Sequence, residues 1–302
     1  MKKTQDLWKV RPSGILLPAG HSTDLQDRFK TTYLEVKSKG EQIEELYKDN
    51  GLTLPDNSDL AELIKNSKVL WEKWFTNKTA ELEMIMLFNL LHLDRIADAV
   101  LPLKEEPKRV KYLKALISGP LDFLKREKSY AKDIFWELEV WLKLRRKLTT
   151  INLEDPPDIV IELEKSRIGI ACKKLYSEKH VQNVLSEAVH QIEDSFEIGI
   201  VALNLDDFTP ADKVLKSSHA QGMTEKLLNL NADFIQKHER HLRKYLVSGR
   251  LIASIVSTAV IADVTNAKPQ FNNASQWTIW SIPGLEEEKS QILRRLQNLV
   301  MG

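Results

Sequence analysis

The spacing of apolar residues changes once along this chain, and that change constrains the fold more than any other feature. Before residue 148, apolar residues recur every three or four positions, which is the period of one helix face. After it, short runs rich in β-branched residues alternate with helical segments. No strand is expected before residue 148. The sequence therefore predicts a helical first part followed by an α/β part.

The first 125 residues are expected to form an all-helical module. Residues 1–20 contain two prolines and two glycines and indicate an irregular arm. Ser22 is a suitable N-cap for the first helix. Helices are predicted over four segments: 22–50, 60–74, 82–101 and 110–125. We assign this module, residues 1–125, to interaction, dimerisation or substrate positioning.

Residues 126–302 are expected to form one α/β domain with a mixed sheet. The nearly continuous apolar run 198–205 is typical of a strand that is buried on both faces. The other strands are predicted at 148–153, 158–163, 167–173, 251–264 and 277–282. Helices are predicted at 130–147, 178–196, 223–245 and 285–300.

Composition narrows the class of protein. The 302 residues are 42% hydrophobic and 29% charged, which is ordinary for a globular protein. The net charge of +1 provides no global basic field, so a nucleic-acid site must come from local clusters. The single cysteine, Cys172, excludes an intrachain disulfide and a zinc site built mainly from Cys. Because no apolar run is long enough for a signal peptide or a membrane span, a cytoplasmic protein without membrane contact is expected.

The residues that carry chemistry lie at the ends of two neighbouring predicted strands. Asp158 begins one strand, and Lys173 ends the next. Successive strand residues alternate between faces, so Ala171 and Lys173 point one way while Ile170 and Cys172 point the other. If the two strands form a hairpin, Asp158 and Lys173 converge on one face, and the Ala171 side chain should open on the same polar cleft.

This arrangement resembles the PD-(D/E)XK, or restriction-endonuclease-like, superfamily. In that pattern an Asp begins the second core strand, and an acidic residue and a Lys lie two apart on the third. Pro157-Asp158 matches the first element, and Lys173 matches the last. The resemblance covers residues 130–205, about a quarter of the chain. It implies a restriction-endonuclease-like mixed sheet flanked by helices.

The resemblance also implies ligands from the flanking helices. Glu137 or Glu139 would supply the Glu of the preceding helix, and Gln191 would supply the Gln of the following one. Asp158 with Glu137 or Glu139 would then hold Mg²⁺ or Mn²⁺, since these hard cations prefer oxygen ligands.

One position departs from the pattern. Ala171 stands where the superfamily has Asp or Glu. Three explanations stay open: another carboxylate, such as Glu137, Glu139 or Glu162, completes the site; the chain is a natural pseudo-nuclease; or an acidic residue has been replaced to inactivate an enzyme. We count position 171 among the catalytic positions.

The implied function is a metal-dependent nuclease that hydrolyses DNA or, less favoured, RNA. A bound cation would lower the pKa of an attacking water, and Lys173 would stabilise the developing charge. The alternative is an inactive nuclease-fold module that binds nucleic acid or a partner protein. A third hypothesis makes the N-terminal helices a platform for homodimerisation or a partner protein. A role in phage defence is suggested only by the resemblance to this superfamily.

Contacts to the nucleic-acid backbone are expected from basic residues near the site. A cluster ends the helix that carries Glu137, where a structural role at the helix C-terminus is the competing explanation. The predicted contacts are Lys143, Arg145, Arg146, Lys147 and Lys174.

Overall fold

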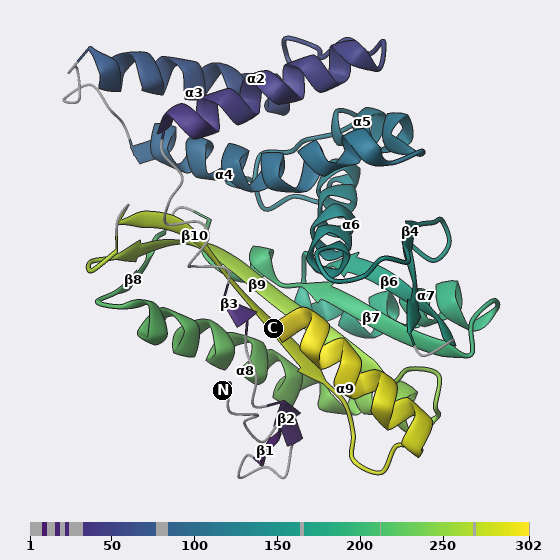
Figure 1. The fold of residues 1–302 in the computed structure, drawn as a ribbon. Coiled ribbons are helices and arrows are strands. Elements are labelled where there is room, and N and C mark those ends of the chain that lie inside the picture. The colour runs from purple at the N-terminus through teal and green to yellow at the C-terminus, as the bar shows by residue number, and fades with distance from the viewer. Residues whose placement is uncertain are drawn as a thin grey trace.

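The computed structural model describes most of the chain (Figure 1). The described ranges are 8–10, 16–18, 22–23, 33–76, 84–163, 166–211, 213–267 and 270–301. Within them, N-terminal helices lie over one face of a large mixed sheet, and a long helix covers the other face (Figure 1).

Three helices form the outer part of the molecule. They are α2 (Tyr33–Asp49), α3 (Asp59–Phe75) and α4 (Met84–Val100). They pack on one another through the apolar stripes that the sequence predicts, and Ser58 caps α3 by accepting a hydrogen bond from the Ala61 amide. The apolar stripe of α2 is buried in this packing. The described part of α2 therefore offers no large exposed stripe to a partner, which weakens the platform hypothesis.

Three expectations about this part are wrong: the helix start at Ser22, the irregular arm over residues 1–20, and the absence of strands before residue 148. Ser22 does not cap a helix, because Ser22–Thr23 forms strand β3, which pairs with the large sheet; the described helix α2 starts at Tyr33. Strands β1 (Trp8–Val10) and β2 (Leu16–Pro18) lie in the predicted irregular arm. Local apolar spacing cannot reveal such pairing between distant segments. Residues 24–32 lie outside the described residues, so the helix predicted there stays a prediction.

Helix α5 (Arg109–Leu116) is shorter than predicted. It was expected to reach residue 125, but Ser118, Gly119 and Pro120 follow its end. Proline disfavours the helical conformation of the residue before it, so the chain leaves the helix here. The segment 117–129 then crosses to α6 (Tyr130–Arg145), which lies between α5 and the sheet (Figure 1).

The α/β part is confirmed as a mixed sheet with helices. The sheet has eight strands in the order β3-β10-β9-β7-β6-β5-β4, with β8 paired to β9. The remaining strands are β4 (Ile151–Leu153), β5 (Ile159–Leu163), β6 (Ser166–Lys174), β7 (Ile198–Asn204), β8 (Leu215–Ser217), β9 (Ala253–Val264) and β10 (Phe271–Trp280).

Strands β5 and β6 form the antiparallel hairpin on which the site prediction depends. The next two pairings, β6 with β7 and β7 with β9, are parallel. Strand β7 is buried along its whole length, as its apolar run predicts. Strand β10 begins six residues before the predicted 277–282, because its polar first half pairs with β9.

Helices cover both faces of this sheet. One face packs on α6 and α9 (Glu287–Met301). The other packs on α7 (Val181–Glu193) and α8 (Ala220–Val247). The first apolar cluster runs from the N-terminal helices through α6 to the sheet. No helix in the described part of the chain is long and apolar enough to cross a membrane.

Candidate functional site

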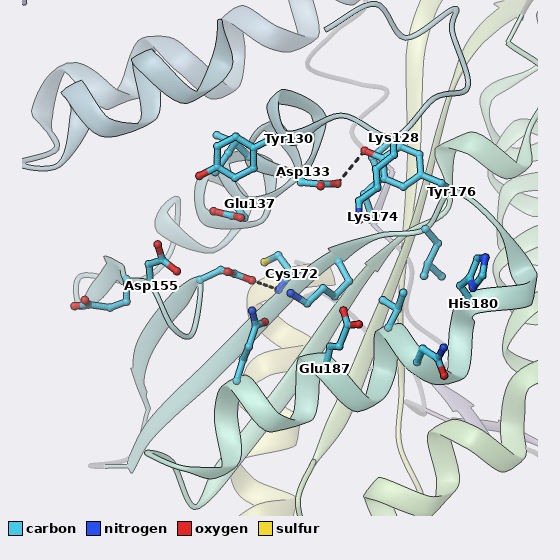
Figure 2. A pocket seen from close by; sticks show the side chains of 18 of the residues that line it. Lys128, Tyr130, Asp133, Glu137, Asp155, Cys172, Lys174, Tyr176, His180 and Glu187 are labelled. Carbon is cyan, nitrogen blue, oxygen red and sulfur yellow. Dashed lines mark hydrogen bonds between the residues drawn. The ribbon is translucent and has the colours of Figure 1, made fainter. Parts of the chain in front are cut away.

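A cavity of about 590 Å³ lies at the carboxyl end of β6. Its walls come from α5, α6, the loop before β5, the end of β6, and α7. Figure 2 shows Tyr130 and Glu137 on one side of it and Glu187 and His180 on the other. Segments distant in sequence therefore meet here because the hairpin β5–β6 lies between two helices.

Asp158 is held at the base of the cavity by the hairpin. It directly precedes β5, and its carboxylate Oδ2 accepts a hydrogen bond of 2.5 Å from the Cys172 amide. The last paired residues of the hairpin at this end are Ile159 and Ile170. The Asp158 side chain thus continues the pairing by one step and is fixed in position.

Glu137 lies on α6 and shares the cavity with Asp158. Its carboxylate makes no hydrogen bond to any residue that the structure describes. Burial and the nearby negative charge of Asp158 raise the pKa of Glu137 well above its usual range, although Lys173 opposes this. Burial also raises the pKa of Asp158, against the lowering effects of the Cys172 amide and Lys173. Two carboxyl groups therefore share a poorly solvated space.

Lys173 brings positive charge to both carboxyl groups. Its side chain is half-buried and lines the cavity, and its charge lowers the pKa of Glu137 and of Asp158. The neighbouring Cys172 is buried, and burial raises the pKa of its thiol well above the ordinary value. A buried thiol of raised pKa is unreactive, which agrees with a packing role.

A second polar group closes the far end of the cavity. The Tyr176 hydroxyl donates a hydrogen bond of 2.9 Å to Asp133 and accepts one of 3.3 Å from the Ser129 amide. Burial raises the pKa of Asp133. Lys132, fully buried, donates to the Lys125 carbonyl oxygen at 2.6 Å. These bonds fix the end of the segment 117–129, at Lys125 and Ser129, beside the cavity.

The structure brings together four of the five predicted catalytic residues. Asp158, Lys173, Glu137 and Gln191 all line the cavity. The Gln191 Oε1 atom is buried and has no hydrogen-bond partner in the described chain. An unpaired buried amide oxygen that lines a cavity calls for an explanation, and a bound water or ligand would supply one.

Glu139 does not belong to this group. Its carboxylate accepts hydrogen bonds from Arg95 Nε at 2.6 Å and from Arg95 Nη2 at 2.5 Å. Arg95 Nη2 also contacts the Asp206 carboxylate at 2.8 Å. Residues two apart on a helix point to different sides, so only one of Glu137 and Glu139 can face the cavity. The expectation that Glu139 is a metal ligand beside Asp158 is therefore corrected.

The expectation that position 171 opens on the polar cleft is also wrong. Ala171 is 0% exposed, belongs to the apolar cluster between the sheet and α7, and is not among the residues that line the cavity. Continuing the pairing of Ile159 with Ile170 by one residue places Asp158 opposite Ala171. The Ala171 methyl group therefore lies opposite Asp158 in the strand register, but it is packed within the apolar cluster.

Two predicted phosphate contacts are buried. Lys174 has a side chain that is 2% exposed, and its ammonium binds Asp207 at 2.7 Å and Asn204 Oδ1 at 3.0 Å. Lys143 is buried with its ammonium over the Trp277 ring. Neither ammonium can reach a nucleic-acid backbone, so these two expectations are corrected.

The rest of the basic cluster lies away from the cavity. Arg145 stacks on Trp141, donates to the Pro102 carbonyl oxygen at 3.1 Å and pairs with Glu105. Lys147 donates to the Asn298 carbonyl oxygen at 3.1 Å, and Arg146 is exposed. None of them lines the cavity, and their role in nucleic-acid binding stays a prediction.

Several cavity residues were missed from the sequence. Among the described residues, those that line the cavity without having been predicted include Lys111, Lys128, Tyr130, Asp133, Asp155, Tyr176, His180 and Glu187. One signal was present: Tyr130, Asp133 and Glu137 are spaced by three and four, so they share a face of α6. The others come from loops and helices whose positions only the tertiary fold determines.

No protein-family model, curated protein or solved structure matches this chain. No group of three or more His, Cys, Asp or Glu side chains able to hold a metal ion occurs among the described residues. The superfamily resemblance therefore stays a prediction, and any function must be argued from the cavity itself.

Proposed function

We propose that this cavity binds one Mg²⁺ or Mn²⁺ ion and that the protein is a metal-dependent nuclease acting on DNA, with RNA the less favoured substrate. The observation that carries the proposal is a pair of carboxyl groups in the cavity wall, the half-buried Glu137 and the buried Asp158, whose pKa values are raised and which share Lys173. Like charges in a poorly solvated space are costly unless a cation or a proton compensates them.

The residues present fit a hard cation. Glu137 forms no hydrogen bond within the described chain, so both its oxygen atoms are available. The amide and carbonyl groups of one strand residue point to the same side, so the Cys172 carbonyl oxygen lies on the side of Asp158. Two carboxylates and a carbonyl are ligands of the type that Mg²⁺ prefers, with water and phosphate completing the shell.

The bound ion would polarise the phosphate and lower the pKa of a water. The protein groups would do the rest. Glu137 and Asp158 hold the ion, and Lys173 places a positive charge where the phosphate gains negative charge. The unpaired Gln191 Oε1 accepts a hydrogen bond from the attacking water and orients it.

The second candidate is an inactive nuclease-fold module that binds nucleic acid or a partner protein without cleaving it. Ala171 favours it, because the position that would supply a third carboxylate carries a buried methyl group. Residues directly opposite in an antiparallel pair have Cβ atoms about 5 Å apart, so a carboxylate at 171 starts close to Asp158. A single substitution therefore separates the two candidates.

The test compares Ala171→Glu with Ala171→Gln, which has the same size without the charge. We expect slow DNA cleavage by the unchanged protein with Mn²⁺, faster cleavage by Ala171→Glu, and none by Glu137→Gln. Without metal, Ala171→Glu should be the less stable of the two 171 variants, because it buries a third carboxylate. Mn²⁺ should raise its melting temperature more than that of Ala171→Gln.

The nuclease proposal fails if neither the unchanged protein nor Ala171→Glu cleaves DNA or RNA with Mn²⁺. Binding of DNA or RNA without cleavage in both proteins would support the second candidate. If Ala171→Glu does not fold even with Mn²⁺, the unchanged protein and Glu137→Gln still decide the matter by cleavage and metal binding.

A further inference from the structure

The charge around the cavity is unsuited to a long polyanion. Carboxyl groups outnumber ammonium groups among the residues that line it. The six carboxyl residues are Asp133, Glu137, Glu154, Asp155, Asp158 and Glu187, and the four lysines are Lys111, Lys128, Lys173 and Lys174. Double-stranded DNA carries one negative charge per roughly 1.7 Å of its axis, and even with one divalent cation bound this lining offers a duplex no net positive charge.

Two of the four lysines are already paired. Lys174 binds Asp207 and Lys111 binds Asp155, each at 2.7 Å. Lys128 and Lys173 form no ion pair or hydrogen bond with the described part of the chain. The cavity can therefore neutralise a few phosphate groups with Lys128, Lys173 and one cation, and no more.

The size of the cavity agrees with this small number. Its volume of about 590 Å³ falls in the range of small-molecule sites, roughly 300–1,000 Å³. The basic cluster at the end of α6, which would have tracked a duplex backbone, lies away from the cavity, and its Lys143 is buried. The geometry thus suits one or two unpaired nucleotides better than a stretch of duplex.

An exposed aromatic ring stands at the rim. Tyr130 is 54% exposed, lines the cavity and lies beside Glu137 (Figure 2). Its hydroxyl has no hydrogen-bond partner in the described chain, so no hydrogen bond there holds the ring in one orientation. Exposed aromatic rings beside lysines bind unpaired bases by stacking.

From these observations, and resting on the proposed nuclease function, we propose that the substrate is single-stranded nucleic acid. One or two nucleotides enter the cavity, a base stacks on Tyr130, and Lys128 binds the phosphate next to the one at Glu137, Asp158 and Lys173. A duplex is bound only where its strands separate. Tyr130 is then the residue that determines specificity for unpaired strands.

The experiment measures binding of a fluorescent eight-nucleotide strand, as DNA and as RNA, and of the same sequence as a duplex. Ca²⁺ replaces Mn²⁺, and the label is checked for intact strands afterwards. We expect at least one of the two single strands to bind tenfold or more tightly than its duplex. The logarithm of its affinity should fall with the logarithm of salt concentration with a shallow slope, about −0.7 for each phosphate contacted.

Matched variants locate the contacts. Tyr130→Ala should weaken single-strand binding about tenfold or more, and Tyr130→Phe should restore it, since the ring carries the stacking. Phe75→Ala is the control, because Phe75 is 72% exposed on α3 and does not line the cavity. Lys128→Ala should reduce the salt slope by about 0.7, whereas Lys125→Ala, an exposed lysine three residues away, should not.

Equal or tighter duplex binding overturns this inference, and so does unchanged binding by Tyr130→Ala. Either result leaves the nuclease proposal standing if Mn²⁺ binding and cleavage are intact. Mn²⁺ binding without any affinity for DNA or RNA overturns both. The melting temperatures of the Tyr130 and Lys128 variants should match that of the unchanged protein, since both side chains are exposed.

Discussion

Helix α6 contributes to two clusters of charged residues, which differ in whether each charge has an opposite partner. Glu139 faces Arg95, which also binds Asp206, and every charge in this cluster has an opposite partner. Glu137, two residues earlier, shares the cavity with Asp158, and among the described residues Lys173 is the one cation that lowers the pKa of both. The first cluster is complete in the protein alone, and the second is not.

The pKa values reflect this difference. Although burial opposes it, Arg95 and Lys174 hold the pKa of Asp206 below its usual range. Burial raises the pKa values of Glu137 and Asp158, and the negative charge of Asp158 raises that of Glu137 further. A closed ion network stabilises a fold when it is intact, whereas an open pair of carboxyl groups costs stability and is typical of a functional site.

Removing Arg95, the cation shared by Glu139 and Asp206, should have the largest effect on stability. Arg95→Ala leaves Glu139 and Asp206 buried without their main partner, so we expect a loss of about 3–5 kcal/mol in the free energy of unfolding. Urea denaturation at pH 7 measures it. A loss below about 1 kcal/mol would mean that water reaches these carboxylates and that they do not depend on Arg95 for their stability.

Neutralising Glu139 should have a smaller effect of the same sign. Glu139→Gln keeps the size of the side chain but replaces a charge-assisted pair with Arg95 by a neutral contact. Hydrogen bonds to charged groups contribute about 1.5–3 kcal/mol, and we expect a loss in that range. The same denaturation experiment applies, and an increase in stability would remove the distinction between the two clusters.

Neutralising Glu137 should have the opposite sign. Glu137→Gln removes a carboxylate whose charged form is disfavoured, so the metal-free protein should gain about 1 kcal/mol or more near pH 8. A carboxyl group with a raised pKa in the folded state contributes stability below its unfolded pKa and loses it as pH rises through the folded pKa. The advantage of the variant should therefore disappear near pH 4. An advantage that is constant with pH would argue against the raised pKa.

The sequence predicted the core of this site for identifiable reasons. Strand alternation and the turn between β5 and β6 placed Asp158 and Lys173 together, since both depend on neighbours in the chain. Gln191, and Glu137 or Glu139 as alternatives, came instead from the resemblance to the PD-(D/E)XK superfamily. Apolar patterning along neighbouring residues also predicted the sheet strands 158–163, 167–173 and 198–205.

What the sequence did not predict depends on contacts between distant segments. The pairing of β3 with β10 requires residues more than 240 positions apart to meet. The choice between Glu137 and Glu139 was settled by Arg95, which lies on α4. The burial of Ala171 depends on how α7 packs on β6, and alternation alone gave its face but not its exposure.

The central claim is that Glu137 and Asp158 form a cation site. Calorimetric titration of the metal-free protein with Mn²⁺ tests it most directly, with Glu137→Gln and Glu139→Gln measured beside it. We predict one Mn²⁺ bound per chain, affinity lowered tenfold or more by Glu137→Gln, and affinity unchanged by Glu139→Gln if that variant is folded. Equal Mn²⁺ affinity in the unchanged protein and Glu137→Gln, or no Mn²⁺ binding at all, would contradict the claim.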